Sequence, residues 1–465
     1  MRLFNRFFSI YDFILVLGDL AVVCLATVVL HAVNFYFEMS PRPEWIFWTM
    51  QAMAMAIIVV LSFYYSDLYA IDQTLSIREL LLRLMGGIGL ACILIGFISY
   101  PIPRFGKTLY ASEVSLLIFG LCVWRIGFMR VIEKTPIRAK VIVVGLQAIG
   151  KLVAEELLRQ KKLGMQVVGF VGQSAGELTL SYGNPVRVSL PIYQTSSLTT
   201  LFEHNGADRI LLACAEGYEG TLGRELIKLR TRGVAIEDCH SFYERLVSKI
   251  IVADLSAEWL VRSKGFRRDR LVMASKRGID IVVALAGLIL SAPVMLLTAI
   301  AIKLETQGPI LYRQDRVGQN GKSLTIYKFR SMSESAEADV GPVWAVKDDP
   351  RVTRVGRLIR KLRIDEIPQM INVLKGEMSF VGPRPEREFF VQTLSKKIPY
   401  YSLRHSVKPG ITGWAQICYP YGDSEQDALE KLQYDLYYMK NMSLLFDLQI
   451  LFESLKVVVL GRGAR

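Results

Sequence analysis

Four long apolar runs near the N-terminus constrain the fold of this chain more than any other feature. They are Phe13–Val33, Trp45–Tyr65, Leu84–Tyr100 and Leu109–Met129. Each is close to the roughly 20 apolar residues with which an α-helix crosses a bilayer. The first is too long for a signal peptide and lacks a small-residue cleavage site. We therefore predict a four-helix transmembrane region over residues 1–135.

The basic residues around these runs favour one orientation. They precede the first run, separate the second from the third and follow the fourth, as Arg2, Arg6, Arg78, Arg83, Arg130, Lys134, Arg138 and Lys140. Arg42, Arg104 and Lys107 weakly oppose this distribution. The positive-inside rule then places both ends of the region in the cytoplasm. Asp19 lies within the first run, where we expect an interhelical hydrogen bond rather than a functional acid.

Composition narrows the class of protein. Of 465 residues, 52% are hydrophobic, and the net charge is +13. This balance suggests a membrane protein that meets anionic lipid or a phosphorylated substrate. Neither a zinc-finger spacing nor an RNA-binding aromatic signature occurs, so nucleic acid is not an expected partner. The six cysteines form no CxxC pair, and with four histidines a His-based metal centre is not expected.

Strand and helix patterns alternate over residues 136–256. "KVIVVG", "MQVVGFV", "RILLA" and "GVAIED" are typical of buried strands, with helical stretches between them. This alternation predicts a doubly wound, Rossmann-like α/β domain. Its first turn, Gly145 to Gly150, has Gln147 where a dinucleotide fingerprint has glycine. Because that side chain would obstruct a pyrophosphate, we expect no bound dinucleotide.

A fifth apolar run, Ile281–Ile302, lies in the remaining part, residues 257–465. Ser291 and Pro293 interrupt it near its middle, and basic clusters flank both of its ends. A spanning helix would put one cluster outside, whereas a helix that enters, kinks at Pro293 and returns keeps both inside. An ordinary kinked transmembrane helix is the alternative. We favour a re-entrant helix over residues 278–302.

An acidic pair, Asp365 and Glu366, follows a basic amphipathic stretch. Arg351, Arg354, Arg357 and Arg360 recur every three residues, which predicts a helix lying at the lipid interface. N-capping of a following helix is the plain interpretation of the acids, because Pro368 suits a first helical turn. The alternative is a phosphoryl-transfer site in which the pair holds a divalent cation and the basic surroundings keep Asp365 ionised.

Other residues suit an anion site. Lys328 and Arg330, in "YKFRSM", would share one face of an extended segment. Arg384 stands between two prolines, and Arg363 directly precedes Ile364 and the acidic pair. Lys408 begins "KPGITGWAQ", in which Gly410 and Gly413 flank a turn whose amides could meet phosphate.

From about Lys276 onward, the chain resembles the bacterial sugar transferases, the monotopic phosphoglycosyl transferases. The resemblance rests on "SKRGIDIVVALAGLILSAP", "GPILYRQDRVGQNGKSLTIYKFRSM", "RIDEIPQMINVLKGEMSFVGPRPE" and "KPGITGWAQ". It differs at the kink, where the family often has Ser directly before Pro and this chain has Ala292 between. The four helices and the Rossmann-like domain are similar to the large branch of the family.

The resemblance implies transfer of a hexose-1-phosphate from a UDP-sugar to undecaprenyl phosphate, with release of UMP. This reaction would start a repeat unit of exopolysaccharide, capsule or O-antigen. Asp365 would be the nucleophile that carries the phosphosugar, with Glu366 as its partner and Mg²⁺ held by both. Lys328, Arg330, Arg363, Arg384 and Lys408 would bind substrate. The resemblance also implies a re-entrant helix, a homodimer, and a bacterial inner-membrane location with the catalytic domain on the cytoplasmic face.

The predicted fold class is a membrane helical bundle, a Rossmann-like α/β domain, and an α-rich monotopic catalytic domain with a re-entrant membrane helix. Two other functions were weighed. A membrane-bound nucleotide-sugar dehydratase or epimerase needs a second glycine fingerprint and a Tyr-xxx-Lys pair, which the C-terminal half lacks. A non-catalytic regulator of polysaccharide export leaves the acidic pair among phosphate-binding groups unexplained. The sequence does not distinguish glucose from galactose as the sugar.

Overall fold

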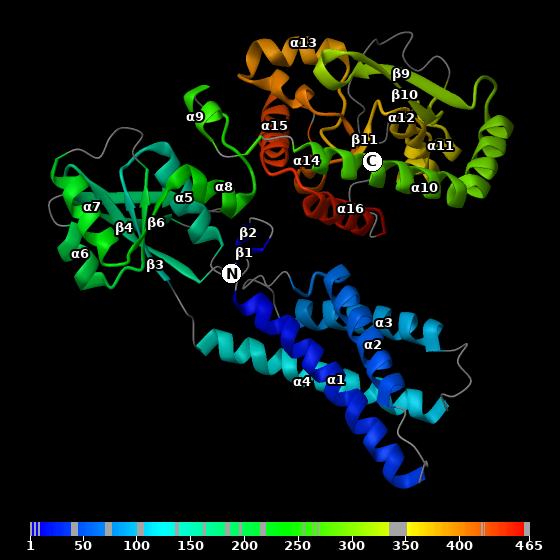
Figure 1. Cartoon of the computed structure of the whole chain (residues 1–465), viewed down its shortest axis with the longest axis horizontal. Helices are drawn as coiled ribbons and strands as arrows, with labels where there is room; N and C mark the ends of the chain where they lie inside the picture. The colour runs from blue at the N-terminus through cyan, green and yellow to red at the C-terminus, as the bar shows by residue number, and fades with distance from the viewer. Residues whose placement is uncertain are drawn as a thin grey trace. The chain divides into compact units, whose positions relative to one another are not determined.

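The chain divides into two units in the computed structural model, Met1–Phe242 and Tyr243–Arg465 (Figure 1). The structure describes residues 2–3, 6–7, 10–38, 45–69, 77–99, 107–134, 139–160, 164–181, 187–194, 198–213, 220–253, 255, 257–263, 265–266, 269–333, 351–419, 422 and 424–459.

Four helices follow the four apolar runs, after a short pair of strands, β1 (Arg2–Leu3) and β2 (Arg6–Phe7). The helices are α1 (Ile10–Glu38), α2 (Trp45–Tyr65), α3 (Ile77–Ser99) and α4 (Lys107–Lys134). Among the described residues, Phe13–Leu30 of α1 and Val114–Val131 of α4 are long and apolar enough to span a bilayer. The described apolar segments of α2 and α3 are shorter, so four membrane crossings stay a prediction.

Asp19 is fully buried in this bundle and ion-paired with Arg125 of α4. The Arg125 Nη2 lies 2.5 Å from Asp19 Oδ2, and its Nε donates to Oδ1 at 3.2 Å. The Tyr69 hydroxyl donates to the same carboxylate at 2.8 Å. The interhelical hydrogen bond predicted for Asp19 is therefore confirmed. Close packing accompanies it, because Gly18 lies directly against Trp124.

A six-stranded sheet follows, with the order β5-β6-β4-β3-β7-β8. The four predicted strands, β3, β4, β7 and β8, are confirmed and pair in parallel. Two further strands were not predicted: β6 pairs in parallel with β4, and the edge strand β5 runs antiparallel to β6. The strands are β3 (Ala139–Val144), β4 (Met165–Gly172), β5 (Gly176–Ser181), β6 (Arg187–Gln194), β7 (Arg209–Leu212) and β8 (Ala235–Asp238). The helices of this region are α5 (Ala148–Arg159), α6 (Leu198–Asn205), α7 (Thr221–Thr231) and α8 (Cys239–Val247).

The turn after β3 keeps one feature of a dinucleotide fingerprint. Gly150 lies so close to Ala213 that an added Cβ would come within 2.9 Å of the alanine methyl, so this glycine serves helix–strand packing. Gln147 is the N-cap of α5 and its side chain makes no capping hydrogen bond. The absence of a bound dinucleotide in this domain stays a prediction.

The C-terminal unit combines short strands with many helices. Its elements are α9 (Ala257–Arg262), α10 (Arg270–Glu305), β9 (Leu311–Val317), η3 (Gln319–Gly321), β10 (Ser323–Phe329), α11 (Arg354–Lys361), η4 (Ile364–Gln369), α12 (Met370–Lys375), β11 (Ser379–Val381), α13 (Glu388–Lys397), η5 (Tyr401–Ser406), β12 (Gly410–Thr412), α14 (Trp414–Cys418), α15 (Glu425–Lys440) and α16 (Leu444–Val459). β9 and β10 form an antiparallel hairpin, and β11 pairs with β12 in parallel.

The core of this unit begins earlier than the sequence boundary after residue 256. Ile250 and Val252 are buried in it, and the Trp414 indole donates to the Ser248 carbonyl at 2.9 Å. Lys249 also pairs with Glu430 at 2.9 Å. The described residues from Ser248 to Leu255 therefore pack with the C-terminal unit, because Ile250, Val252 and Leu255 contribute to its apolar core.

The fifth apolar run lies in α10, a continuous helix of 36 residues that contains Pro293. Both of its ends pack on the C-terminal unit (Figure 1). Lys276 and Asp280 are buried near its start, and Thr298 and Ile302 near its end. Large apolar side chains stay exposed between them, namely Val282, Val283, Leu285, Ile289, Leu290, Val294, Leu296, Leu297 and Ile300. The helix thus presents one face to its own unit and an apolar face outward.

Candidate active site

The acidic pair follows a sharp change of chain direction. Helix α11 ends at Lys361, and Arg363 has a left-handed backbone with φ 57°. A 3₁₀ helix, η4, then carries Asp365, Glu366 and Pro368. Neither carboxylate is the N-cap of a helix, since Arg363 precedes η4 and Gln369 precedes α12. The capping interpretation is not supported here.

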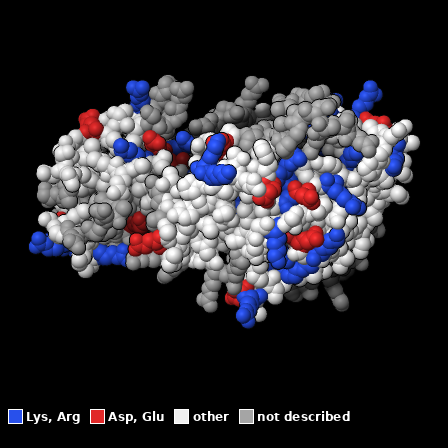
Figure 2. Space-filling model, turned by 90° about the horizontal axis from the view of Figure 1, so that it is seen from above, with Lys and Arg blue, Asp and Glu red and all other residues white. Residues whose placement is uncertain are grey.

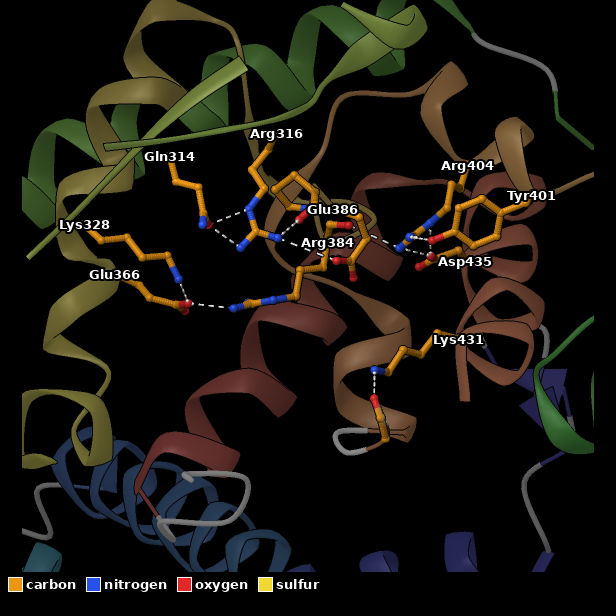
Figure 3. Close-up of polar contacts among 12 residues, drawn as sticks. Gln314, Arg316, Lys328, Glu366, Arg384, Glu386, Tyr401, Arg404, Lys431 and Asp435 are labelled. Carbon is orange, nitrogen blue, oxygen red and sulfur yellow. Dashed lines mark hydrogen bonds and ion pairs between the residues drawn. The ribbon is translucent and has the colours of Figure 1, made fainter. Parts of the chain in front are cut away.

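Glu366 is the centre of a cluster of cations. Its Oε1 accepts hydrogen bonds from Lys328 Nζ at 2.8 Å and from Arg384 Nη2 at 3.0 Å (Figure 3). Arg363 Nη1 lies 4.0 Å from its other oxygen. Although burial favours the neutral acid, these three cations hold the pKa of Glu366 well below its ordinary value. Glu366 is therefore an ionised anchor for Lys328 and Arg384.

Asp365 is buried but open on one side to a cavity. No hydrogen bond to its carboxylate occurs among the described residues. Burial and the adjacent charge of Glu366 raise the pKa of Asp365, against the opposing effect of Lys328, Arg360 and Arg363. From the sequence, the basic surroundings were predicted to keep Asp365 ionised. The structure instead directs the closest cations to Glu366, so Asp365 is the harder of the two acids to ionise.

The cavity has a volume of about 1310 Å³ and both apolar and polar lining residues. Helix α10 contributes the apolar Leu288, Ala292, Met295, Leu296 and Ala299, and other elements add Ile310, Leu311, Phe329, Met332 and Phe390. The polar lining is mostly cationic, with Arg313, Gln314, Arg316, Lys328, Arg330, Arg351, Arg360, Asp365, Glu386 and Arg387. Basic side chains also surround acidic ones on the face of this unit seen from above (Figure 2). Such a cavity suits a ligand with an anionic group next to a hydrocarbon chain.

The carboxylate pair fits a magnesium ion only in part. Mg²⁺ is commonly held by one or two carboxylates together with water and substrate phosphates. Among the described residues no cluster of three or more His, Cys, Asp and Glu could enclose a metal. Within the described part of the chain, the Asp365 carboxylate accepts no hydrogen bond, whereas Glu366 has only Oε2 uncommitted to Lys328 and Arg384. The pair therefore fits an ion whose remaining ligands come from substrate and water.

Two predicted substrate ligands remain, and one of them, Arg330, lines the same cavity as Asp365 and Lys328. Arg330 donates to the Gln307 and Thr306 carbonyls and to the Thr306 hydroxyl, which ties it to the end of α10. Strand β10 ends at Phe329, so the alternation that would put Arg330 beside Lys328 stops before it. Lys408 is half-buried, and the charges that act on its pKa are Arg277, Asp280 and Lys276 of α10, not the acidic pair. Substrate binding by Arg330 and Lys408 stays a prediction.

Gly410 and Gly413 have a packing role in the structure. A Cβ at either would collide with the backbone of Gly382, since "KPGITG" and "VGPRPE" pack main chain against main chain. The Gly382 amide donates to the Thr412 carbonyl at 2.9 Å. The glycines thus bring two loops together, whereas the sequence argument expected their turn to meet phosphate.

At the predicted membrane kink, the Ser291 hydroxyl donates to the Leu288 carbonyl at 3.5 Å, the long limit of a hydrogen bond. Pro293 does not interrupt the helix. In α11, Leu358 and Leu362 are 57% and 50% exposed beside the exposed Arg354 and Arg357. This face suits the predicted lipid interface, which stays a prediction.

Sequence reasoning missed several residues of the polar lining, above all Gln314, Arg316, Glu386 and Arg360. Gln314 and Arg316 are two apart on β9, and the Gln314 Oε1 accepts from Arg316 Nε at 2.9 Å. Their spacing in "YRQDRVG" carries the same two-residue signal that selected Lys328. Arg360 was assigned to the lipid face but lines the cavity and donates to Ser331 at 2.9 Å.

Comparison with known proteins agrees with this geometry. The model of the bacterial sugar transferase family matches residues 271–461. A UDP-N-acetylgalactosamine-undecaprenyl-phosphate N-acetylgalactosaminephosphotransferase of Aeromonas hydrophila is 49% identical over 190 residues, 41% of this chain and 45% of that protein. A UDP-glucose:undecaprenyl-phosphate glucose-1-phosphate transferase of Xanthomonas campestris pv. campestris is 31% identical over 336 residues, 70% of this chain and 67% of that protein.

A third relative is shorter. The exopolysaccharide production protein PSS of Rhizobium leguminosarum bv. phaseoli is 39% identical over 193 residues, which cover 96% of its length. The chain spans less than half of the Aeromonas protein. These matches show that the chain belongs to the bacterial sugar transferase family.

Proposed function

We propose that this chain transfers a hexose-1-phosphate from a UDP-sugar to undecaprenyl phosphate and releases UMP. The observation that carries the proposal is the open carboxylate of Asp365 in a cavity lined by cationic side chains and by apolar side chains of α10. The cationic side chains suit the diphosphate, and the apolar side chains of α10 suit a polyprenyl chain. The names of the family members above describe sugar phosphotransferases that act on undecaprenyl phosphate.

The reaction is proposed to run in two displacements at phosphorus. An Asp365 oxygen attacks the phosphorus that bears the sugar, the diphosphate bond breaks, and UMP leaves with the bonding electrons. A phosphate oxygen of undecaprenyl phosphate then attacks the same phosphorus and restores the carboxylate. Each step brings only one anionic substrate to the site, which limits repulsion between them.

The surrounding residues have distinct proposed parts. Lys328, Arg363 and Arg384 are placed by Glu366 and neutralise phosphate charge. Mg²⁺, held by Asp365 and Glu366, would supply further charge neutralisation on the phosphates when bound. Burial keeps water from the acyl phosphate. The lipid-linked phosphosugar formed in the second step would start a repeat unit of exopolysaccharide, capsule or O-antigen.

We further propose that the protein lies in the bacterial inner membrane, with four crossings, a re-entrant α10 and the site on the cytoplasmic face. A homodimer is part of the same proposal. The named sugars differ between relatives, N-acetylgalactosamine in one and glucose in another. The donor is therefore to be found with a panel of UDP-sugars, scored by UMP release.

The proposal is tested by trapping the covalent species. Purified protein mixed with its UDP-sugar and Mg²⁺, without lipid acceptor, should release one UMP and gain a phosphosugar on Asp365, seen by mass spectrometry. Asp365→Asn keeps the shape of the side chain and should lose at least about 10³-fold in UMP release, a loss of about 4 kcal/mol. Glu366→Gln should be severely impaired through misplacement of Lys328 and Arg384.

Two outcomes would contradict it. Turnover of Asp365→Asn near the wild-type rate would remove the carboxylate from the chemistry. UMP release at background with every donor would instead favour a non-catalytic function in polysaccharide export.

A further inference from the structure

The loop that carries Arg384 is held by an unusual set of donors. Residues 383–386 form no helix or strand, yet the four successive carbonyls all accept hydrogen bonds. The donors are Gly410 N to Pro383 at 2.9 Å, Arg404 Nη2 to Arg384 at 3.2 Å, Arg316 Nη1 to Pro385 at 3.3 Å and Val317 N to Glu386 at 2.8 Å. Pro383 and Pro385 have no amide hydrogen. The loop is therefore fixed largely through its acceptors.

Two of these donors are arginine side chains, which arrive from distant parts of the chain. Arg404 lies on η5 and is 5% exposed. Its Nη2 is 2.7 Å from Asp435 of α15, and its Nη1 donates to the Tyr401 hydroxyl at 2.8 Å (Figure 3). A planar guanidinium can serve these two partners and the Arg384 carbonyl at once, because its donors point in fixed, different directions.

The second arginine, Arg316 of β9, is held in a comparable way. Gln314 accepts from it, and Glu386 lies 3.6 Å away across the same loop (Figure 3). Burial lowers the pKa of Arg316 to about 10, with Glu386 opposing and Arg384 and Arg387 adding to that effect. The side chain therefore remains charged at neutral pH.

A buried arginine is a costly way to satisfy one carbonyl. A neutral donor would do so without the loss of hydration that a buried charge incurs. What the two arginines add is a rigid, charge-assisted hold on adjacent carbonyls, from two sides of the loop. The backbone between them bears the guanidinium that meets Glu366 Oε1 at 3.0 Å.

We infer that Arg404 and Arg316 are positioning residues that clamp the carbonyls of Arg384 and Pro385 and thereby fix where the Arg384 guanidinium meets Glu366 and the substrate phosphate. Asp435 and Tyr401 orient Arg404, and Gln314 orients Arg316. The effect on catalysis rests on the proposed function; the effect on the loop does not.

Hydrogen–deuterium exchange tests the clamp without reference to activity. In Arg404→Lys, which keeps the charge but loses the fork, the peptide that covers residues 381–388 should exchange at least 10-fold faster. Arg316→Lys should also speed exchange of this peptide. It keeps the test decisive if Arg404→Lys does not fold. Lys249→Gln is the matched control, because it breaks an ion pair to α15, the helix of Asp435, at 2.9 Å. In Lys249→Gln the peptide that covers residues 381–388 should exchange as in the wild type. If its exchange is unchanged in both Arg404→Lys and Arg316→Lys, the two arginines do not clamp the loop.

A double-mutant cycle tests the link to Arg384. Loss of a hydrogen bond to a charged group, about 1.5–3 kcal/mol, corresponds to a fall of roughly 10- to 100-fold in kcat/KM for Arg404→Lys. If Arg404 acts through Arg384, the same change made in an Arg384→Lys background should cost less than about 2-fold.

A full 10-fold loss in both backgrounds would show that Arg404 acts by another route, and would overturn the positioning assignment. Failure of the wild type to release UMP would refute the proposed function alone, since the exchange measurement still decides the clamp.

Discussion

At the scale of single residues, two adjacent carboxylates have opposite environments. The left-handed Arg363 and the 3₁₀ turn send neighbouring side chains in different directions. Glu366 meets Lys328 and Arg384, whereas Asp365 meets the cavity. Environments that separate the pKa values of two acids commonly separate their functions. Here one acid organises cations and the other is open to react.

This division gives a pH prediction. Asp365 must be ionised to attack, and its pKa is raised. The value of kcat/KM should therefore fall as the pH decreases, and the apparent pKa of this acid limb should lie above the ordinary pKa of an aspartate. Lys328 is a cation that lowers this pKa. Lys328→Gln should therefore move the acid limb of the kcat/KM profile to higher pH, besides reducing the maximum about 10-fold or more.

The matched control is Lys375→Gln. Lys375 is an exposed cation of α12 that donates a hydrogen bond to Tyr327, the neighbour of Lys328 on β10. The acid limb of Lys375→Gln should stay at the wild-type position. An unmoved limb in Lys328→Gln would show that some group other than Asp365 controls the acid side of the profile.

Sequence reasoning reached part of this site. The acidic pair, Lys328 and Arg384 were predicted and lie together. Arg330 also lines the cavity, but its guanidinium donates to Gln307 and Thr306, because β10 ends at Phe329 and the two-residue alternation stops there. The clamp by Arg404 could not be foreseen, since nothing local in the sequence shows that Arg404 and Arg384, 20 residues apart, meet.

At the scale of elements, α10 explains how a long apolar run belongs to a folded domain. Lys276 donates to the Val381 carbonyl at 3.0 Å and pairs with Asp447 at 2.6 Å. At the other end, Glu305 accepts from the Arg354 and Val355 amides at 2.7 and 3.0 Å. Hydropathy alone cannot show these contacts. They favour a helix whose two ends stay on one side of the bilayer.

Cysteine labelling in intact vesicles tests this topology. Lys276 is a poor site because it is buried, whereas Leu271 and Leu304 are 78% and 83% exposed. In a background without native cysteines, Leu271→Cys and Leu304→Cys should both react only with a reagent that reaches the cytoplasmic face. Ile289→Cys, 71% exposed in the middle of the helix, is the control and should be shielded from polar reagents by lipid. Reaction of the two end positions from opposite faces would establish a spanning helix.

At the scale of the whole molecule, the sequence predicted the order of three regions and the parallel strands β3, β4, β7 and β8. These follow from hydropathy and from alternation of strand and helix, which are local properties. The strands β5 and β6 and the extent of the C-terminal unit were not predicted, because they depend on tertiary pairing. Ile250 and Val252 look like ordinary apolar residues until the core that buries them is known.

The extent of the C-terminal unit, whose core includes Ile250 and Val252, decides which fragment should remain active. Because the site residues all lie in the C-terminal unit, residues 241–465 should fold and release UMP in nanodiscs at a rate within about 10-fold of the full chain. A fragment of residues 257–465 should fold poorly. It lacks Ile250 and Val252, whose burial is worth about 1.5–3 kcal/mol each, and the partner of the Trp414 indole. Total stabilities of about 5–15 kcal/mol leave little margin for such losses.

The two fragments form a matched pair, and a third measurement covers the α/β domain. Thermal unfolding in detergent should give a cooperative transition for residues 241–465 and a broad or missing one for 257–465. Purified full-length protein should carry no stoichiometric NAD, since Gln147 stands at the turn that would approach a pyrophosphate. If 241–465 folds cooperatively yet releases no UMP while the full chain does, the N-terminal unit takes part in the reaction, and chemistry confined to the C-terminal unit is refuted.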